Sequence, residues 1–214
     1  SLHDALPIFS MKSFRWWTPK SPYLYEIQAE LRDREGRVLH RDSQSFGMRS
    51  FYMDTEEIPR GNFYLNGERI RLRGANTMGH EQQCVMKGDM GQLTEDILLA
   101  KICNMNFLRL TQRPVQEEVY EYCDMLGLMT QTDLPLFGVL RIPQFAEALR
   151  QTEEMEKMVR KHPCNILVSY INEPFPNAYN QPHRHLSRAD LMRFFTCADE
   201  VVKMNNPDRV TKHV

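Results

Sequence analysis

The sequence has no long hydrophobic run and almost no net charge. It contains no stretch of about eighteen consecutive apolar residues, so no segment is expected to span a membrane. Lysine and arginine number 27 against 28 aspartate and glutamate residues, and the two signs are interspersed. Proteins that bind nucleic acid or a charged membrane surface usually carry a basic patch or a block of like charge. We therefore expect neither nucleic acid nor membrane as a partner.

Closely spaced cysteine pairs are also absent from the sequence. The five cysteines are an odd number, and no two of them have C-x-x-C spacing. Disulfide frameworks and zinc sites usually show paired or closely spaced cysteines. We expect reduced thiols that pack as small apolar side chains, and we expect no cofactor and no metal. His183 and His185 are spaced like metal ligands, but no third ligand is near them in the sequence, so we interpret them as exposed loop residues.

The start of the chain has no basic segment followed by a long apolar one, so no signal peptide is expected there. The first ten residues resemble the translated adapter tail that is found at the ends of assembled sequencing reads. We expect residues 1–13 to be a non-native or disordered tail and the native N-terminus to be missing. The localisation of the protein therefore cannot be inferred.

Residues 14–58 show the two-residue periodicity of antiparallel strands. Residues 23–31 alternate apolar and polar side chains, and a turn separates them from a second short apolar stretch. This pattern predicts a hairpin with one buried face. Residues 45–53 predict a further strand. A generic β-meander fits the same pattern.

Residues 59–214 alternate short apolar strands with amphipathic helices. Asn66-Gly67 between two apolar runs predicts a tight hairpin turn before the first of these units. Expected strands cover residues 70–75, 107–110, 128–132, 165–171 and 209–214. Expected helices cover 94–104, 114–126 and 145–161, and a fourth begins at the capping box of Ser187 and Asp190. Short connections between strands and helices predict a parallel sheet flanked by helices.

The buried strand at 165–171 ends at Asn172-Glu173-Pro174, and Arg160-Lys161-His162-Pro163 precedes it. In parallel α/β folds the chemistry lies at the carboxyl ends of the strands. These two segments resemble the acid/base region of glycoside hydrolase family 2, which contains β-galactosidases, β-glucuronidases and β-mannosidases. Two further segments are similar to that family: Phe46-Gly47-Met48-Arg49 and Arg73-Gly74-Ala75-Asn76.

The resemblance implies a multidomain β then α/β chain. Residues 14–58 would be the C-terminal strands of an immunoglobulin-like β-sandwich, and residues 59–214 the first half of a (β/α)8 TIM barrel, within an internal fragment of a longer enzyme. It also implies a retaining exo-glycosidase that hydrolyses β-glycosidic bonds of a carbohydrate. The family nucleophile is a glutamate on a later strand, so we expect the 214 residues alone to be inactive. A homo-oligomer of the full-length enzyme is left open.

The resemblance assigns roles to particular side chains. Glu173 would be the general acid/base, and Asn172 would bind the sugar hydroxyl next to the anomeric carbon, although a loop-capping carboxamide also fits. Arg109 would hydrogen-bond the nucleophile, and no fixed partner for it is evident in the sequence. His80 would point into the sugar pocket, or be a solvated loop histidine. Asp133 would support the site or cap a loop.

The chain departs from the family pattern in its expected pocket wall. Thr111-Gln112-Arg113-Pro114 replaces a Ser-His-Tyr-Pro-like segment, and Val168 stands where a tryptophan is usual. The choice among galactose, glucuronate and mannose therefore stays open. Two other interpretations remain: a non-catalytic carbohydrate-binding or scaffolding relative with the same barrel, and an unrelated barrel hydrolase with Asn-Glu after its fourth strand.

Overall fold

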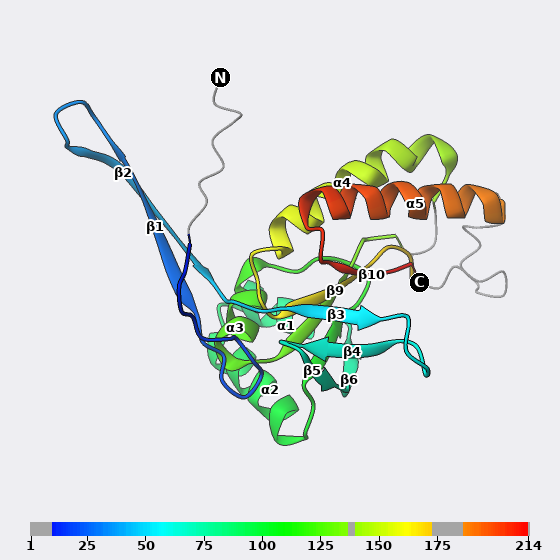
Figure 1. The fold of residues 1–214 in the computed structure, drawn as a ribbon, viewed down its shortest axis with the longest axis horizontal. Coiled ribbons are helices and arrows are strands. Elements are labelled where there is room, and N and C mark those ends of the chain that lie inside the picture. Colours follow the sequence, from blue (N-terminus) through cyan, green and yellow to red (C-terminus); the bar gives the residue numbers. More distant parts are fainter. Residues whose placement is uncertain (1–9, 137–139, 173–185, 214) are drawn as a thin grey trace.

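A five-stranded parallel sheet lies at the centre of the computed structural model, which describes residues 10–136, 140–172 and 186–213 (Figure 1). The spatial order is β10-β9-β8-β7-β6, and each neighbouring pair is parallel. The strands are β6 (Gly74–Thr77), β7 (Phe107–Leu110), β8 (Met129–Asp133), β9 (Asn165–Ser169) and β10 (Val210–Lys212). Parallel neighbours need a crossover between them. The predicted parallel α/β arrangement is confirmed.

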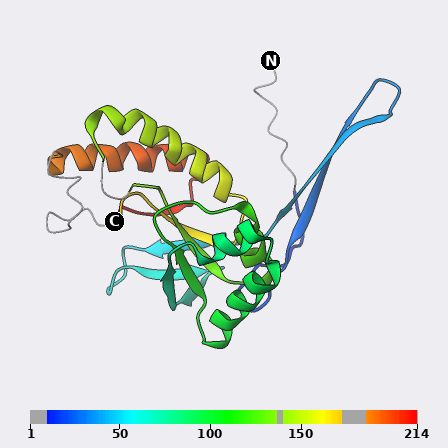
Figure 2. The same ribbon diagram turned by 180° about the vertical axis from the view of Figure 1, so that it is seen from behind.

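The crossovers contain helices in two groups. Helices α4 and α5 pack against each other, and α1, α2 and α3 form the other group (Figures 1 and 2). The helices are α1 (His80–Lys87), α2 (Met90–Ile102), α3 (Glu117–Leu126), α4 (Phe145–Val159) and α5 (Arg188–Asn205), with a 3-10 turn η1 (Ile142–Gln144). In the described part of the chain, none of them has the length and apolarity to cross a bilayer.

Local sequence signals set several of these helix ends. The predicted capping box is confirmed at the start of α5, where the Asp190 backbone N–H donates to Ser187 Oγ at 3.1 Å and the Ser187 N–H donates to the Asp190 carboxylate at 3.1 Å. Gly127 ends α3 in the left-handed conformation, with φ of 75°. The structure corrects the start of α2: the cap is Asp89, which accepts from the Gln92 N–H, and Thr94 lies inside the helix.

The middle of the sheet is buried on both faces. Every position of β8 and of β9 is buried, although β8 reads Met-Thr-Gln-Thr-Asp. Its threonines are accommodated because Thr130 and Thr132 donate to the Asn165 carboxamide oxygen at 3.2 Å and 2.8 Å. Buried polar groups need hydrogen-bond partners inside the protein, and both threonines of β8 find theirs on β9.

A second sheet has three antiparallel strands in the order β3-β4-β5. They are β3 (Phe51–Asp54), β4 (Asn62–Leu65) and β5 (Glu68–Ile70). Asn66 and Gly67 connect β4 to β5 with φ of 53° and 82°, as a type I′ turn requires, so the predicted hairpin turn is confirmed. Two predicted boundaries are wrong. Residues 45–53 are divided between β2 and β3, and the first parallel strand begins at Gly74, four residues after the predicted start at Ile70.

The first hairpin, β1 (Tyr25–Arg32) with β2 (Val38–Phe46), projects from the rest of the chain (Figure 1). The antiparallel pairing was predicted, but the expected buried face is not present. Leu31 and Leu39 are 62% and 63% exposed, and most positions of both strands are exposed. An alternating sequence indicates which face of a strand is apolar, but that face is buried only where a second layer covers it. No second layer covers this hairpin among the described residues.

Residues on both sides of this hairpin attach it to the rest of the chain. Arg49 is half-buried and donates to the carbonyl groups of Pro163 and Asn165 at 3.0 Å and 3.1 Å, and its loss of contact with water lowers the pKa of its guanidinium to about 10. At Gly47 a Cβ atom would lie 2.7 Å from Cγ of Pro163, so a larger residue would clash. Trp17 is fully buried, and its indole N–H donates to the Asp124 carbonyl at 2.8 Å. The Arg49 and Gly47 contacts fix the amino end of β9, and the Trp17 bond attaches the chain before β1 to α3.

Candidate active site

Three polar side chains meet at the carboxyl ends of neighbouring parallel strands. Arg109 lies in β7, Asp133 ends β8, and Asn172 follows β9. The strand register places Arg109 beside Gln131 and Asp133 beside Ser169. Because β7, β8 and β9 are adjacent and parallel, their carboxyl ends share one edge of the sheet. The sequence predicted Arg109 and Asn172 at this edge, and the structure brings them into contact.

Arg109 is held by an ion pair with Asp133. The Arg109 Nη2 and Nε atoms donate to Asp133 Oδ2 at 2.6 Å and 3.0 Å. The side chain of Arg109 is 16% exposed and that of Asp133 is 1% exposed. A charge-assisted two-point contact of this kind fixes the plane of the guanidinium. No fixed partner for Arg109 was evident in the sequence, and the structure supplies one from the next strand.

Asp133 is a hub of hydrogen bonds. Besides Arg109, its carboxylate accepts from the Gln131 side-chain amide at 2.9 Å, from the Gln112 backbone N–H at 3.0 Å and from the Ser169 hydroxyl. A buried carboxylate needs such donors to offset the loss of water. Gln112 adopts a φ of 72°, uncommon for a residue other than glycine. Its N–H bond to Asp133 gives that conformation a physical reason.

Asn172 is oriented from both sides. Its side-chain oxygen accepts from Arg109 Nη2 at 2.8 Å, and its backbone N–H donates to the Leu136 carbonyl at 3.1 Å. The residue is 8% exposed. These contacts hold the chain at the point where it leaves β9. Glu173, the next residue in the sequence, lies outside the described residues, as do His183 and His185.

The structure places His80 at the first position of α1 rather than in a loop. Its Nε2 atom lies 2.8 Å from Asp96 Oδ2 of α2, and its side chain is 64% exposed. Within the described part of the chain, its hydrogen-bond partner is therefore outside the Arg109 cluster. A contact between His80 and a sugar stays a prediction. The helix was missed because residues 80–87 carry no apolar stripe at helical spacing.

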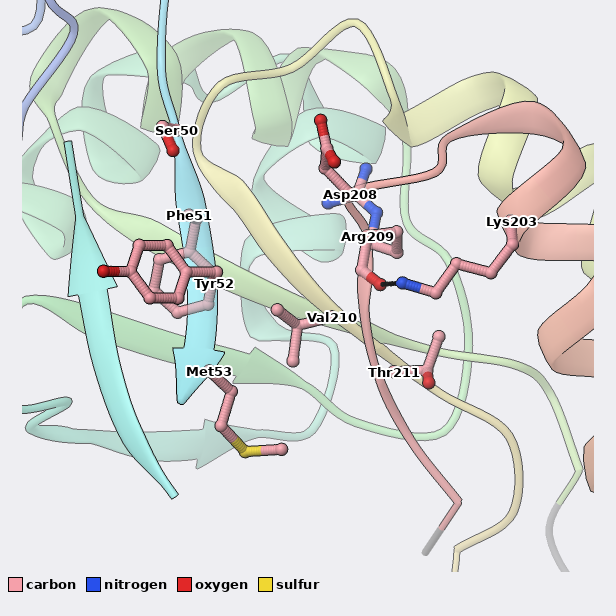
Figure 3. Close-up of a pocket in the computed structure, with 9 residues that line it drawn as sticks. All are labelled: Ser50, Phe51, Tyr52, Met53, Lys203, Asp208, Arg209, Val210 and Thr211. Atoms are coloured by element: carbon pink, nitrogen blue, oxygen red, sulfur yellow. Dashed lines mark hydrogen bonds between the residues drawn. The ribbon is translucent and has the colours of Figure 1, made fainter. Parts of the chain in front are cut away.

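A pocket of about 460 Å³ lies elsewhere on the molecule (Figure 3). It is lined by residues 50–53 at the start of β3 and by residues 208–211 at the start of β10, with Lys203 at its side. The Lys203 ammonium donates to the Arg209 carbonyl at 2.6 Å. These residues include the amino end of β10, whereas Asn172 follows the carboxyl end of β9. The pocket is therefore separate from the polar cluster.

Sequence reasoning missed the residues that support the cluster: Gln112, Gln131 and Ser169. The available signal was composition. Gln131 and Asp133 belong to a strand flanked by apolar neighbours, and polar side chains in a buried strand must pair with one another. Which pairs form depends on strand register, which residue spacing alone does not give.

Two family models match this chain. A family model described as "Glycosyl hydrolases family 2, TIM barrel domain" matches residues 57–212. A second, described as "Glycosyl hydrolases family 2", matches residues 2–49. This second match begins inside residues 1–13, which were expected to be a non-native tail.

Individual relatives agree with the family models. The chain is 30% identical over 172 residues to a β-galactosidase of Alteromonas mediterranea, covering 76% of this chain and 16% of that protein. It is 31% identical over 185 residues to a β-galactosidase of Priestia megaterium, with coverage of 77% and 17%. Among solved structures, Bacteroides uniformis β-glucuronidase 3 superposes with a TM-score of 0.73 at 26% identity, covering 92% of this chain and 24% of that one. The chain thus spans a small part of the length of these relatives.

Proposed function

The chain belongs to glycosyl hydrolase family 2, and on that premise we propose that the intact protein hydrolyses β-glycosidic bonds of a carbohydrate with retention of configuration at the anomeric carbon. Glu173 is its general acid and base. The observation that carries this proposal is the position of Asn172, which directly precedes Glu173 and is held by Arg109 at the carboxyl end of β9. The similarity to named β-galactosidases and a β-glucuronidase supports the bond type.

We assign residues 14–58 to the end of an immunoglobulin-like sandwich and residues 59–214 to the first half of a (β/α)8 barrel. The order of the five parallel strands supports the second assignment, because a barrel extends the same pairing to eight strands. The β1–β2 hairpin supports the first, because its exposed apolar residues are those that a second sheet would cover. The β3-β4-β5 sheet crosses the division at 58/59 and links the two units.

The mechanism requires two carboxyl groups about 5–5.5 Å apart. In the first step Glu173 donates its proton to the leaving-group oxygen while the second carboxylate attacks the anomeric carbon, and the glycosidic bond breaks. In the second step the Glu173 carboxylate takes a proton from water, which attacks the same carbon and releases the second carboxylate. We assign that nucleophile to a glutamate on a later barrel strand, outside these 214 residues. The 214 residues alone would then be inactive.

Asn172 and Arg109 position the substrate and the charges around it. Because the side-chain oxygen of Asn172 accepts from Arg109, the side-chain NH2 group is left to donate to the sugar hydroxyl next to the anomeric carbon. Hydrogen bonds to that hydroxyl strengthen in the transition state. Arg109, fixed by Asp133, contributes a positive charge near the expected nucleophile and favours its ionised form.

Replacing Asn172 by alanine in the full-length protein is expected to lower kcat/KM by about 10²–10³-fold, the cost of losing one transition-state hydrogen-bond donor. Steady-state kinetics with the best aryl glycoside measure the loss. Circular dichroism and the thermal midpoint serve as controls for folding. An unchanged kcat/KM in a folded variant would remove Asn172 from substrate binding.

The proposed function is tested with the full-length protein and a panel of para-nitrophenyl β-galactoside, β-glucuronide and β-mannoside. We expect turnover of at least one member, and proton NMR should show the β-anomer as the first product. An α-anomer formed first would contradict retention. Saturable sugar binding without turnover of any member would favour the alternative, a carbohydrate-binding relative that keeps the barrel.

A further inference from the structure

Three side chains that commonly bind metal ions meet outside the Arg109 cluster. His80 and Cys84 come from α1 and Asp96 comes from α2. The His80 Nε2 atom lies 2.8 Å from Asp96 Oδ2, and the Cys84 Sγ atom lies 4.0 Å from the same oxygen. The three ligand atoms are all within 4.8 Å of one another. They are an imidazole nitrogen, a thiol sulfur and a carboxylate oxygen.

The fold brings these atoms together by two simple devices. His80 and Cys84 are four residues apart on α1, so they share one face of that helix. The chain then turns sharply at Gly88, which ends α1 with φ of 70°, and at Asp89, which caps α2. This corner directs Asp96 of α2 back toward the same face of α1.

The carboxylate is also oriented by a neighbour. The Gln92 side-chain amide donates to Asp96 Oδ1 at 2.7 Å, while Oδ2 is the atom that faces His80 and Cys84. An outer hydrogen bond of this kind, holding one oxygen so that the other can bind an ion, is a regular feature of protein metal sites. Cys84 is buried and the His80 side chain is 64% exposed, so the cluster has one sealed side and one open side.

We propose that His80, Cys84 and Asp96 bind a divalent transition-metal ion, with Zn²⁺ as the best fit. Zinc accepts nitrogen, sulfur and oxygen ligands together, whereas a thiolate disfavours Mg²⁺ and Ca²⁺. With Cys84 and Asp96 ionised, the two negative charges balance the charge of the ion. Three protein ligands leave a fourth tetrahedral position for water on the exposed side.

The spacing suits such an ion after small side-chain rotations. Zinc–ligand bonds of about 2.0–2.3 Å in a tetrahedral arrangement put the ligand atoms roughly 3.4–3.6 Å apart. The distances of 2.8 Å and 4.0 Å lie on either side of this range. The competing explanation is a simple His80–Asp96 hydrogen bond beside a packed thiol. The two explanations differ in whether Cys84 matters for metal affinity.

The experiment uses the full-length protein, stripped of metal with a chelator and then titrated with Co²⁺. We expect a thiolate-to-cobalt charge-transfer band in the near ultraviolet, which Zn²⁺ abolishes by displacing Co²⁺. Cys84→Ser should remove the band. His80→Ala and Asp96→Asn should weaken Co²⁺ binding by at least about 10–100-fold, since even outer-shell changes have effects of that size.

Cys103→Ser is the matched control, because Cys103 is an exposed cysteine near the end of α2 and outside the trio. It should leave both the band and the Co²⁺ affinity unchanged. The absence of a thiolate band in the unsubstituted protein, or a band that persists in Cys84→Ser, would overturn the proposal. If Cys84→Ser does not fold, His80→Ala decides the question, because His80 is exposed. Unchanged Co²⁺ affinity in that variant would also overturn the proposal.

Discussion

Glu173→Gln in the full-length protein is expected to slow the cleavage of glycosides with poor leaving groups by about 10²–10⁴-fold, the usual contribution of a general acid. An alkoxide leaving group needs the proton that Glu173 supplies, and glutamine has none to give. The leaving group of an activated aryl glycoside departs as a stable phenolate without needing a proton. The first step with such a substrate should therefore proceed at nearly the original rate. A plot of the first-step rate against leaving-group pKa, from pre-steady-state kinetics, should therefore become much steeper in the variant.

The second step gives an independent check of the same residue. Water attack on the glycosyl-enzyme needs the Glu173 carboxylate as a base, so Glu173→Gln should accumulate this intermediate with aryl substrates and show a burst of phenolate. Azide, which needs no base, should restore turnover. Glu154→Gln, on the exposed surface of α4, is the control and should behave like the unsubstituted protein. Equal losses on good and poor leaving groups would exclude Glu173 as the acid.

The order of the elements could be predicted because strong local signals coincide with them. The apolar strand at 107–110 and the capping box of α5 depend on neighbouring residues alone, and both were found where expected. Helix α1 could not be found in this way, because its eight residues have two buried members and no apolar stripe. The predicted burial of the β1–β2 hairpin was wrong for a different reason. Its pairing is local, but its burial depends on a second layer that no pattern within the hairpin can supply.

The sequence could predict that Arg109 and Asn172 lie at one edge of the sheet, but it could not predict the hydrogen bonds that hold them. Arg109 lies near the end of β7 and Asn172 follows β9, two strands of one parallel sheet, so topology alone predicts that they share an edge. The ion pair with Asp133 depends on the register of β7 against β8, and the Gln112 bond to Asp133 comes from a residue with a left-handed backbone. Neither follows from residue spacing. A buried arginine does require a partner, and Asp133 was the nearest strand-end carboxylate in the sequence.

Asp133→Asn is expected to lower the free energy of unfolding by about 3 kcal/mol, the lower end of the range for breaking a buried ion pair. The lower end applies because the Arg109 side chain keeps 16% exposure and can be partly hydrated. Asparagine has nearly the same shape, but its NH2 group would face donors that now point at the carboxylate, from Gln131 and Ser169 among others. Urea unfolding of the full-length protein measures the change.

A double-mutant cycle separates the ion pair from the rest of the network. Arg109→Met removes the charge that Asp133 compensates, so the double variant should be less destabilised than the sum of the two single variants. Glu147→Gln, in an exposed pair with Arg150, is the matched control and should change stability little. Strict additivity of Arg109→Met and Asp133→Asn would mean that the pair does not act as a unit. Asp133→Asn should also reduce kcat/KM, because Arg109 would then lose the contact that orients it toward Asn172.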